Sequence, residues 1–141
     1  MRTIWILGTL AVLSCATVVI GRQLPGAGAY ALLRPSRRPP AGATPAGCVD
    51  TAFKGHDVVL RGWRCASTAP RRGVIVYLHG IADNRESAAG LVPKLTARGF
   101  DLIAYDSRAH GASGGDDCTY GYFERLDLRR VLDDAGDGPS C

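Results

Sequence analysis

The sequence predicts an α/β fold built on a parallel sheet, and two observations lead to this expectation. First, Gly73 to Leu78 is a short apolar run without polar alternation, as expected of a strand covered on both faces, and Phe100 to Tyr105 is expected to be the next buried strand. Second, segments with helical periodicity follow these runs, at Asn84 to Arg98 and at Tyr122 to Leu132. Strand, helix, strand and helix at this spacing indicate βαβ units and therefore parallel pairing.

Residues 1–22 form a separate N-terminal segment. Thr3 to Gly21 contains no charged residue, and nineteen such residues reach the length of a membrane span. We expect an uncleaved membrane anchor through residues 3–21. The alternative is a signal peptide cleaved near Ala27-Gly28-Ala29, which would leave a secreted or periplasmic protein.

Two features of the sequence give opposite indications of the side of the membrane on which the domain lies. The arginines that follow the span would place the domain in the cytoplasm. An even number of cysteines beyond the span instead suggests an oxidising compartment. These cysteines are Cys48, Cys65, Cys118 and Cys141. We expect the domain to lie outside the cytoplasm.

Residues 23–47 are expected to form a semi-extended linker, because prolines at high density disrupt helices and strand pairing. Five of the eight prolines fall there: Pro25, Pro35, Pro39, Pro40 and Pro45. Arg34, Arg37 and Arg38 in this linker either contact anionic lipid headgroups or are simply solvated.

The folded domain is expected to span residues 48–141 and to begin with a hairpin. Val49 to Phe53 and Val58 to Trp63 flank a turn near His56-Asp57. Residues that face each other across this turn have numbers that sum to about 113, which is the sum for Cys48 and Cys65. The register therefore predicts a disulfide between these two cysteines.

Each of the two predicted helices has an expected inner face. In the first helix this face comprises Leu91, Leu95 and the aliphatic stem of Arg98, and in the second it comprises Phe123, Leu126 and Val131. Gly99 is expected to cap the first helix at its C-terminus. Pro93 either lies in the first turns of that helix or kinks it.

Two motifs follow the predicted parallel strands, at the edge where α/β proteins bind ligands. His79-Gly80 ends the first strand, and Asp106-Ser107-Arg108-Ala109-His110-Gly111-Ala112-Ser113 follows the second. With Gly62-Trp63, Asn84-Arg85 and Arg98-Gly99-Phe100, these motifs resemble bacterial α/β-hydrolases of the serine-aminopeptidase and monoacylglycerol-lipase-like group.

The resemblance implies an incomplete α/β-hydrolase fold, with the hairpin and the first parallel βαβα units. It also implies that the backbone N–H of Ile81 contributes to an oxyanion hole. Structural roles follow for the other motif residues: His79, Gly80, Asp106, Arg108, His110, Gly111 and Ser113. We expect Arg108 to pair with a carboxylate and so fix the second loop.

Gly111-Ala112-Ser113-Gly114-Gly115 matches the G-x-S-x-G pattern of a nucleophile elbow, but an elbow needs a strand directly before it and a helix directly after. In this fold the order is serine, acid, histidine. His56, His79 and His110 all precede Ser113, so we reject Ser113 as a nucleophile. The expectation is a serine hydrolase of ester or amide bonds by descent, truncated before the nucleophile elbow, without catalytic residues and inactive as this chain.

Other functional classes are less well supported. The net charge of +4 comes from arginines in the first 47 residues, so no basic face for nucleic acid is expected. Asp106 and His110 lack a third metal ligand, and no cofactor is expected. The alternatives are a membrane-tethered, non-enzymatic binding module and an unrelated small α/β domain. Self-association is also expected, through an open sheet edge beside Phe100–Tyr105.

Overall fold

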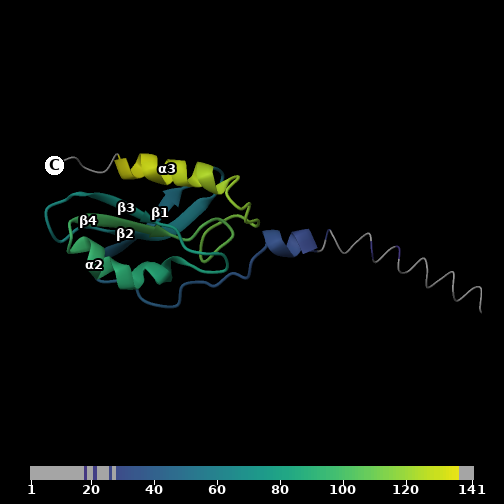
Figure 1. Ribbon diagram of the computed structural model, residues 1–141, viewed down its shortest axis with the longest axis horizontal. Coiled ribbons are helices and arrows are strands. Elements are labelled where there is room, and N and C mark those ends of the chain that lie inside the picture. Colours follow the sequence, from purple (N-terminus) through teal and green to yellow (C-terminus); the bar gives the residue numbers. More distant parts are fainter. Residues whose placement is uncertain (1–17, 19–20, 22–25, 27, 137–141) are drawn as a thin grey trace, which may run out of the picture. The chain divides into compact units, whose positions relative to one another are not determined.

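A four-stranded mixed sheet forms the centre of the domain in the computed structural model, which describes residues 18, 21, 26 and 28–136. The strands β1 (Cys48–Lys54), β2 (Val59–Cys65), β3 (Gly73–Tyr77) and β4 (Phe100–Tyr105) lie in the order β1-β2-β4-β3. β2 pairs antiparallel with both β1 and β4, and β3 pairs parallel with β4 (Figure 1). Parallel pairing is therefore confirmed for β3 and β4.

The chain divides into two units, Met1–Leu33 and Arg34–Cys141. In the first unit, residues 28–33 are helical, within the segment expected to be a semi-extended linker. Of the apolar run from Thr3 to Gly21, only Val18 and Gly21 are among the described residues. The described helices include none that is both long enough and apolar enough to cross a bilayer.

The β1–β2 hairpin has the register that the sequence predicts. Cys48 faces Cys65, and Lys54 faces Val59 at the turn. A disulfide joins Cys48 to Cys65, which confirms the predicted pairing. Cys118 is a free, buried cysteine, and Cys141 lies outside the described residues.

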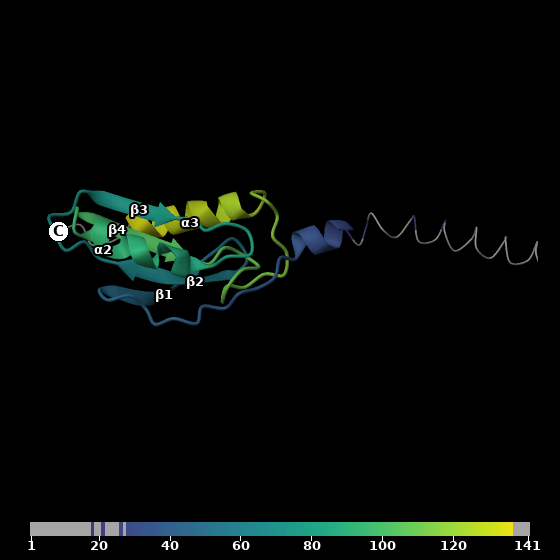
Figure 2. The same cartoon turned by 60° about the horizontal axis from the view of Figure 1, so that its bottom comes forward.

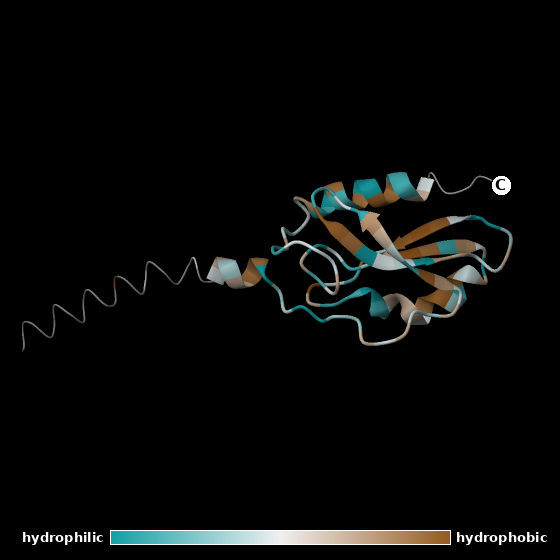
Figure 3. Cartoon of the chain, turned by 180° about the vertical axis from the view of Figure 1, so that it is seen from behind, coloured by the Kyte–Doolittle hydropathy of each residue, from teal (hydrophilic) through white to brown (hydrophobic). Residues whose placement is uncertain are grey.

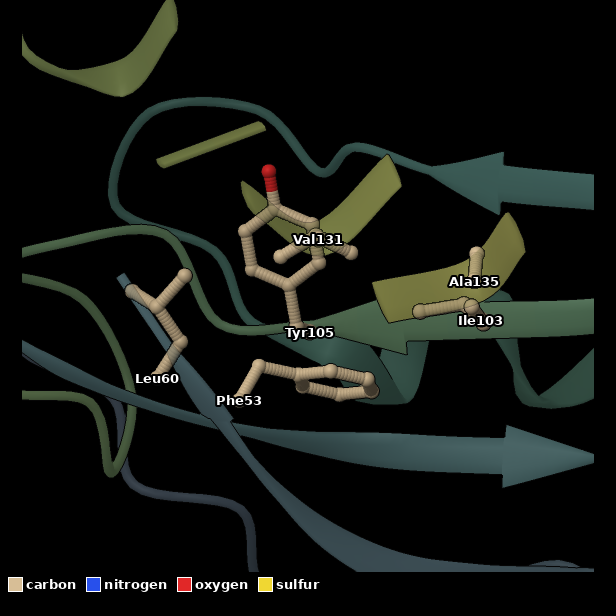
Figure 4. Packing of buried hydrophobic residues seen from close by; sticks show 6 residues of the cluster. All are labelled: Phe53, Leu60, Ile103, Tyr105, Val131 and Ala135. Atoms are coloured by element: carbon tan, nitrogen blue, oxygen red, sulfur yellow. The ribbon is translucent and has the colours of Figure 1, made fainter. Parts of the chain in front are cut away.

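Helices cover both faces of the sheet, and side chains alternate between the two faces along β4. Ile103 and Tyr105 pack with Val131 on the side of α3 (Glu124–Gly136), in the cluster that Figure 4 shows. Leu102 and Ala104 pack on the other side, against η1 (Arg85–Leu91) and α2 (Val92–Thr96). Figure 3 shows the apolar strands between the helices, with polar residues on the outer side of α3. β4 is thus buried on both faces, as predicted.

The first predicted helix is divided in two, and its expected inner face is correct only for Leu95, which packs against the core. A 3₁₀ segment, η1, runs directly into α2, and Pro93 lies at the start of α2. A 3₁₀ helix has about 3.0 residues per turn rather than 3.6, so the phase of the face changes. The buried residues are Ala88, Val92 and Thr96, while Leu91 is exposed, Arg98 is exposed and Leu95 is half-buried.

Gly99 ends α2 as predicted. Its φ is +88°, a left-handed conformation that suits glycine, and its N–H donates to the carbonyl of Thr96. A Cβ at this position would collide with the carbonyl of Pro70. The turn from α2 into β4 therefore requires glycine.

The second helix, α3, begins at Glu124, two residues later than expected, and its buried face also differs. The buried residues are Asp127, Val131 and Ala135, with a spacing of four, whereas Phe123 and Leu126 are half-buried. Val131 alone was placed correctly on this face. The buried carboxylate of Asp127 has a specific partner, described below.

Of the two parallel strands, the one at the edge of the sheet is β3, and not the strand Phe100–Tyr105, as was expected. β4 lies between β2 and β3, so its two sides are already paired (Figure 2). All five residues of β3 are half-buried, which corrects the expectation of a fully buried strand. The sequence located both apolar strands but could not supply their order in the sheet.

Residues 34–47, here called the strap, contain no helix or strand, as expected of a semi-extended segment, but they are hydrogen-bonded to the domain. Arg34 pairs with Asp117 at 3.0 Å, and Arg37 donates to the carbonyls of Ser113, at 2.6 Å, and Gly115. Further contacts join the strap to η1: Asn84 Nδ2 to the Arg38 carbonyl, and the N–H groups of Ala41 and Gly42 to Glu86. The folded unit therefore begins at Arg34 rather than at Cys48.

Candidate functional site

The loop after β3 contains a tight turn that presents Ile81. Asp83 N–H donates to the Gly80 carbonyl at 3.3 Å, and Ala82 has a φ of +56°. A positive φ at the third position is characteristic of a type II turn. Within the described residues the N–H of Ile81 has no acceptor, and the Ile81 side chain is exposed. The turn therefore leaves this N–H available to a ligand.

His79 connects this turn to the loop after β4. Its Nδ1 lies 2.7 Å from the Gly80 carbonyl, and its Nε2 lies 2.9 Å from the backbone nitrogen of Ser107. Because the carbonyl can only accept and the amide can only donate, the ring must be neutral with its proton on Nδ1. The ring thus holds the ends of two parallel strands together.

Asp106 is fully buried and organises the second loop. Its carboxylate accepts from the N–H of Arg85 and the N–H of Ala112, both at 2.8 Å. The guanidinium of Arg85 adds an ion pair at 2.8 Å. Since β4 ends one residue before Asp106, these bonds hold the loop against the first turn of η1.

Gly111 makes the close approach of this loop to Asp106 possible. Its φ is +47°, and a Cβ on it would collide with the Asp106 carboxylate. Only glycine meets both conditions without strain. Ala109 also has a positive φ, +60°, a conformation that costs about 1–3 kcal/mol in a residue other than glycine.

Ser113 is buried, and its hydroxyl is fully engaged. Oγ donates to the Asp106 carbonyl at 2.5 Å and accepts from the Arg61 N–H at 2.8 Å. No histidine takes part in these bonds. His110 Nδ1 bonds instead to the Arg108 carbonyl at 2.8 Å, and its Nε2 has no partner among the described residues.

Arg108 pairs with carboxylates that the sequence did not identify. Its Nε lies 2.7 Å from Asp127 Oδ2, and its Nη2 lies 2.8 Å from Asp57 Oδ1. The hydrogen bond to Asp127 is the main cause that raises the pKa of Arg108, so this guanidinium stays charged. The pair joins the loop after β4 to α3 and to the hairpin turn.

Three residues of this network were missed by sequence reasoning: Asp57, Arg85 and Asp127. Asp127 carried a detectable signal, because it lies four residues before Val131 on the apolar face of a predicted helix. The other two partners, Asp57 of Arg108 and Arg85 of Asp106, are distant from them in sequence and carried no local signal of the pairing. Within residues 28–136, no group of three potential ligands is arranged to hold a metal ion.

The comparisons with known proteins agree with this geometry. The family described as "Serine aminopeptidase, S33" matches residues 69–137. An uncharacterized protein of Bacillus subtilis (strain 168), YqkD, is 33% identical over 58 residues, which are 41% of this chain and 19% of that protein.

Solved structures show the same architecture. The Pyrococcus furiosus esterase Pf2001 is 31% identical with a TM-score of 0.65, over 77% of this chain and 42% of the esterase. The α/β-hydrolase GrgF from Penicillium sp. sh18, at 20% identity, has a TM-score of 0.58 over 65% of this chain and 33% of GrgF. Epoxide hydrolase A from Mycobacterium thermoresistibile, at 24% identity, has a TM-score of 0.53 over 63% of this chain and 28% of that enzyme. These last two similarities establish the fold alone.

The fold and the loops at the ends of its parallel strands are those of the N-terminal portion of an α/β-hydrolase fold. This chain contains the N-terminal portion of that fold, and its match is to the serine aminopeptidase S33 family. It spans about a fifth of the curated relative and less than half of each of the three enzymes.

Proposed function

We propose that the chain supplies the oxyanion side of a serine hydrolase that acts on ester or amide bonds. The observation that carries this proposal is the turn from Gly80 to Asp83, which leaves the N–H of Ile81 without an acceptor in the described chain. A fixed backbone N–H at the end of a parallel strand can stabilise the negative charge that develops on a carbonyl oxygen under attack. The 31% identity to an esterase supports the same reaction class.

The remaining motif residues position that donor. His79 holds the turn to Ser107, and Asp106 ties the following loop to Arg85. Gly80 contributes the carbonyl that closes the turn. Arg108, His110, Gly111 and Ser113 stabilise the second loop and contact no reacting group in this proposal.

The 141-residue chain by itself is proposed to be inactive. An oxyanion donor lowers a barrier only when a nucleophile attacks. Ser113 Oγ is held by two backbone groups and, among the described residues, makes no hydrogen bond to a histidine ring. An ester or amide substrate is therefore proposed only for an assembly that also provides a nucleophile, an acid and a histidine.

The oxyanion role can be tested in a chimera in which residues 34–136 replace the matching N-terminal portion of the Pyrococcus esterase. In an esterase-active chimera, Ile81→Pro removes the N–H and should lower kcat by about 10²–10³. Ile81→Ala keeps the N–H and serves as the control. Equal activity of these two variants would exclude Ile81 as the donor.

The inactivity of the isolated chain is tested separately, with a short-chain nitrophenyl ester and a fluorophosphonate label. Neither turnover nor labelling is expected for the chain or for Ser113→Ala. Stoichiometric labelling that disappears in Ser113→Ala would make Ser113 a nucleophile after all.

The location of the protein is a further part of the proposal. The uncharged run from Thr3 to Gly21 supports attachment to a membrane as a single pass. The Cys48–Cys65 disulfide supports a domain on the non-cytoplasmic side, because disulfides persist in oxidising compartments. Alkaline carbonate extraction with intact-mass analysis distinguishes an anchor from a cleaved signal.

A further inference from the structure

The strap runs between the two ends of the parallel strands. These ends are called the carboxyl edge, where β3 and β4 end, and the amino edge, where they begin. The strap ends at Cys48, the first residue of β1, which faces Cys65; Cys65 in turn faces Leu102 near the start of β4. It begins at Arg34, which pairs with Asp117 in the loop that follows β4. The segment that precedes the strap therefore joins the domain at the carboxyl edge of β3 and β4, the edge of the proposed oxyanion site. Figure 2 shows the strap, in dark blue, running along the domain to β1.

Specific bonds hold the strap in this position. Arg37 donates from both terminal nitrogens to the carbonyls of Ser113 and Gly115. Glu86 accepts from the backbone of Ala41 and Gly42. At the far end, the disulfide at Cys48 fixes the transition into β1. The exit point of the N-terminal segment is thus part of the folded domain.

The same edge carries most of the exposed large apolar side chains of the described domain, here called the edge patch: Val59, Leu78, Ile81, Tyr120 and Tyr122. Val59 opens β2 beside the hairpin turn, and Leu78 and Ile81 follow β3. The two tyrosines precede α3, whose Asp127 accepts from the N–H of His56 in that turn. All five therefore belong to the carboxyl edge.

The opposite, amino edge carries fewer such side chains, although Val49, beside Cys48, is exposed there. The loop from Ala66 to Arg72 and the turn at Arg98-Gly99 contain no exposed large apolar residue. Exposed apolar groups that gather on one edge, with tyrosines among them, are typical of a surface that meets a lipid interface.

We propose that the strap holds the carboxyl edge of the sheet against a lipid surface, with the edge patch at the boundary between headgroups and acyl chains. Only twelve residues separate Gly21 from Arg34, a reach of at most about 45 Å even when fully extended. A membrane anchor at Thr3 to Gly21 would therefore limit how far Arg34, where the strap begins, can move from the bilayer. The inference rests on the membrane attachment given in the proposed function. It rests on the hydrolase part of that proposal only in that a substrate would then arrive from the lipid side.

The test places an environment-sensitive fluorophore on single cysteines in the full chain, reconstituted in phosphatidylcholine vesicles. Cys15, Cys118 and Cys141 are replaced by serine, and the Cys48–Cys65 disulfide is kept. Ile81→Cys and Tyr122→Cys probe the edge patch, and Thr68→Cys probes the amino edge. Labels at the edge patch should show a blue shift and quenching by a headgroup-attached nitroxide lipid, and the label at Thr68 should show neither.

A matched pair of variants tests the strap. Arg37→Ala removes the bonds to two carbonyls, whereas Arg38→Ala removes an equal charge from a guanidinium that makes no hydrogen bond among the described residues. Arg37→Ala should reduce the difference between the Ile81 and Thr68 labels, and Arg38→Ala should preserve it. Circular dichroism checks that both variants are folded.

Several results would overturn the proposal. These are failure of the chain to float with vesicles, equal signals at both edges, quenching at Thr68 alone, or equal effects of Arg37→Ala and Arg38→Ala. None of these measurements depends on catalysis. Failure of the hydrolase proposal would therefore appear only in the chimera assay. Failure to float would overturn the membrane attachment as well as this inference, whereas equal signals at both edges in a chain that floats would overturn this inference alone.

Discussion

Arg108, in the loop after β4, and Asp127, in α3, form a buried, bidentate ion pair. Nε lies 2.7 Å from Oδ2, Nη2 lies 3.0 Å from Oδ1, and the residues are only 4% and 1% exposed. Asp127 Oδ1 also accepts from the N–H of His56 at 2.7 Å. One carboxylate thus joins the hairpin turn, the motif loop and the last helix.

Loss of this pair should strongly destabilise the domain. Arg108→Ala leaves the Asp127 carboxylate buried without its counter-charge, which should lower the free energy of unfolding by about 3–5 kcal/mol. Urea denaturation followed by circular dichroism measures the change. Arg129→Ala is the control, because its pair with Asp133 is exposed and should contribute less than about 1 kcal/mol. Similar losses in both variants would mean that the buried pair has no special role.

The Cys48–Cys65 disulfide should contribute about 3 kcal/mol to stability, because it closes a loop of 17 residues in the unfolded chain. Reduction should therefore shift the urea midpoint downward. In the double variant Cys48→Ser/Cys65→Ser the shift should already be present, and a reductant should have no further effect. Non-reducing peptide mapping checks the pairing, and a bridge that involves Cys118 would contradict it.

The stability that Glu124 contributes to the fold should depend on pH. Burial acts to raise the pKa of Glu124, but hydrogen bonds from Thr119 and Gly121 outweigh burial and lower it. A lowered folded-state pKa gives stability that is present above the unfolded value of about 4.3 and is lost as pH falls through the folded pKa.

Glu124→Gln should therefore be less stable than the parent at neutral pH. The difference should shrink below about pH 4, where the parent carboxylate becomes protonated. Unfolding curves across pH measure it, with Asp133→Asn on the exposed face of α3 as the control. A difference that does not change with pH would rule out a role for the charge.

The open edge at β3 should promote self-association. Its sequence, Gly-Val-Ile-Val-Tyr, contains no charge or proline that would protect an unpaired strand. Residues 34–141 should elute as more than a monomer and should bind a hydrophobic dye. Val74→Lys, beside Asp101, should reduce association, and Val49→Lys on the opposite edge strand should not. A monomer with a sharp thermal transition would show that this edge is protected.

The sequence predicted those parts of the fold that depend on local geometry. The hairpin register follows from the alternation of facing residues, and it led directly to the pairing of Cys48 with Cys65. Gly99 was located correctly because the end of a helix favours a left-handed residue. The loops that carry the motif residues were also located, because they directly follow two strands that are mostly apolar.

The remaining features depend on long-range contacts. The position of β4 between β2 and β3 is decided by pairing across the sheet, which the apolar runs do not encode. The inner face of the first helix was misplaced because η1 has a different periodicity from α2. Arg37 looked like a solvated linker residue, since its carbonyl partners, Ser113 and Gly115, have no sequence signature.

The course of the strap also has a consequence for protein engineering. A fusion partner attached ahead of Arg34 enters at the carboxyl edge of β3 and β4, where a bulky tag would obstruct access to the proposed oxyanion site. Removal of the strap, so that the chain begins at Cys48, moves the new amino terminus to the opposite edge and frees the loop carbonyls of Ser113 and Gly115. Two preparations that differ only in where they begin would thus carry their tags at opposite ends of the sheet.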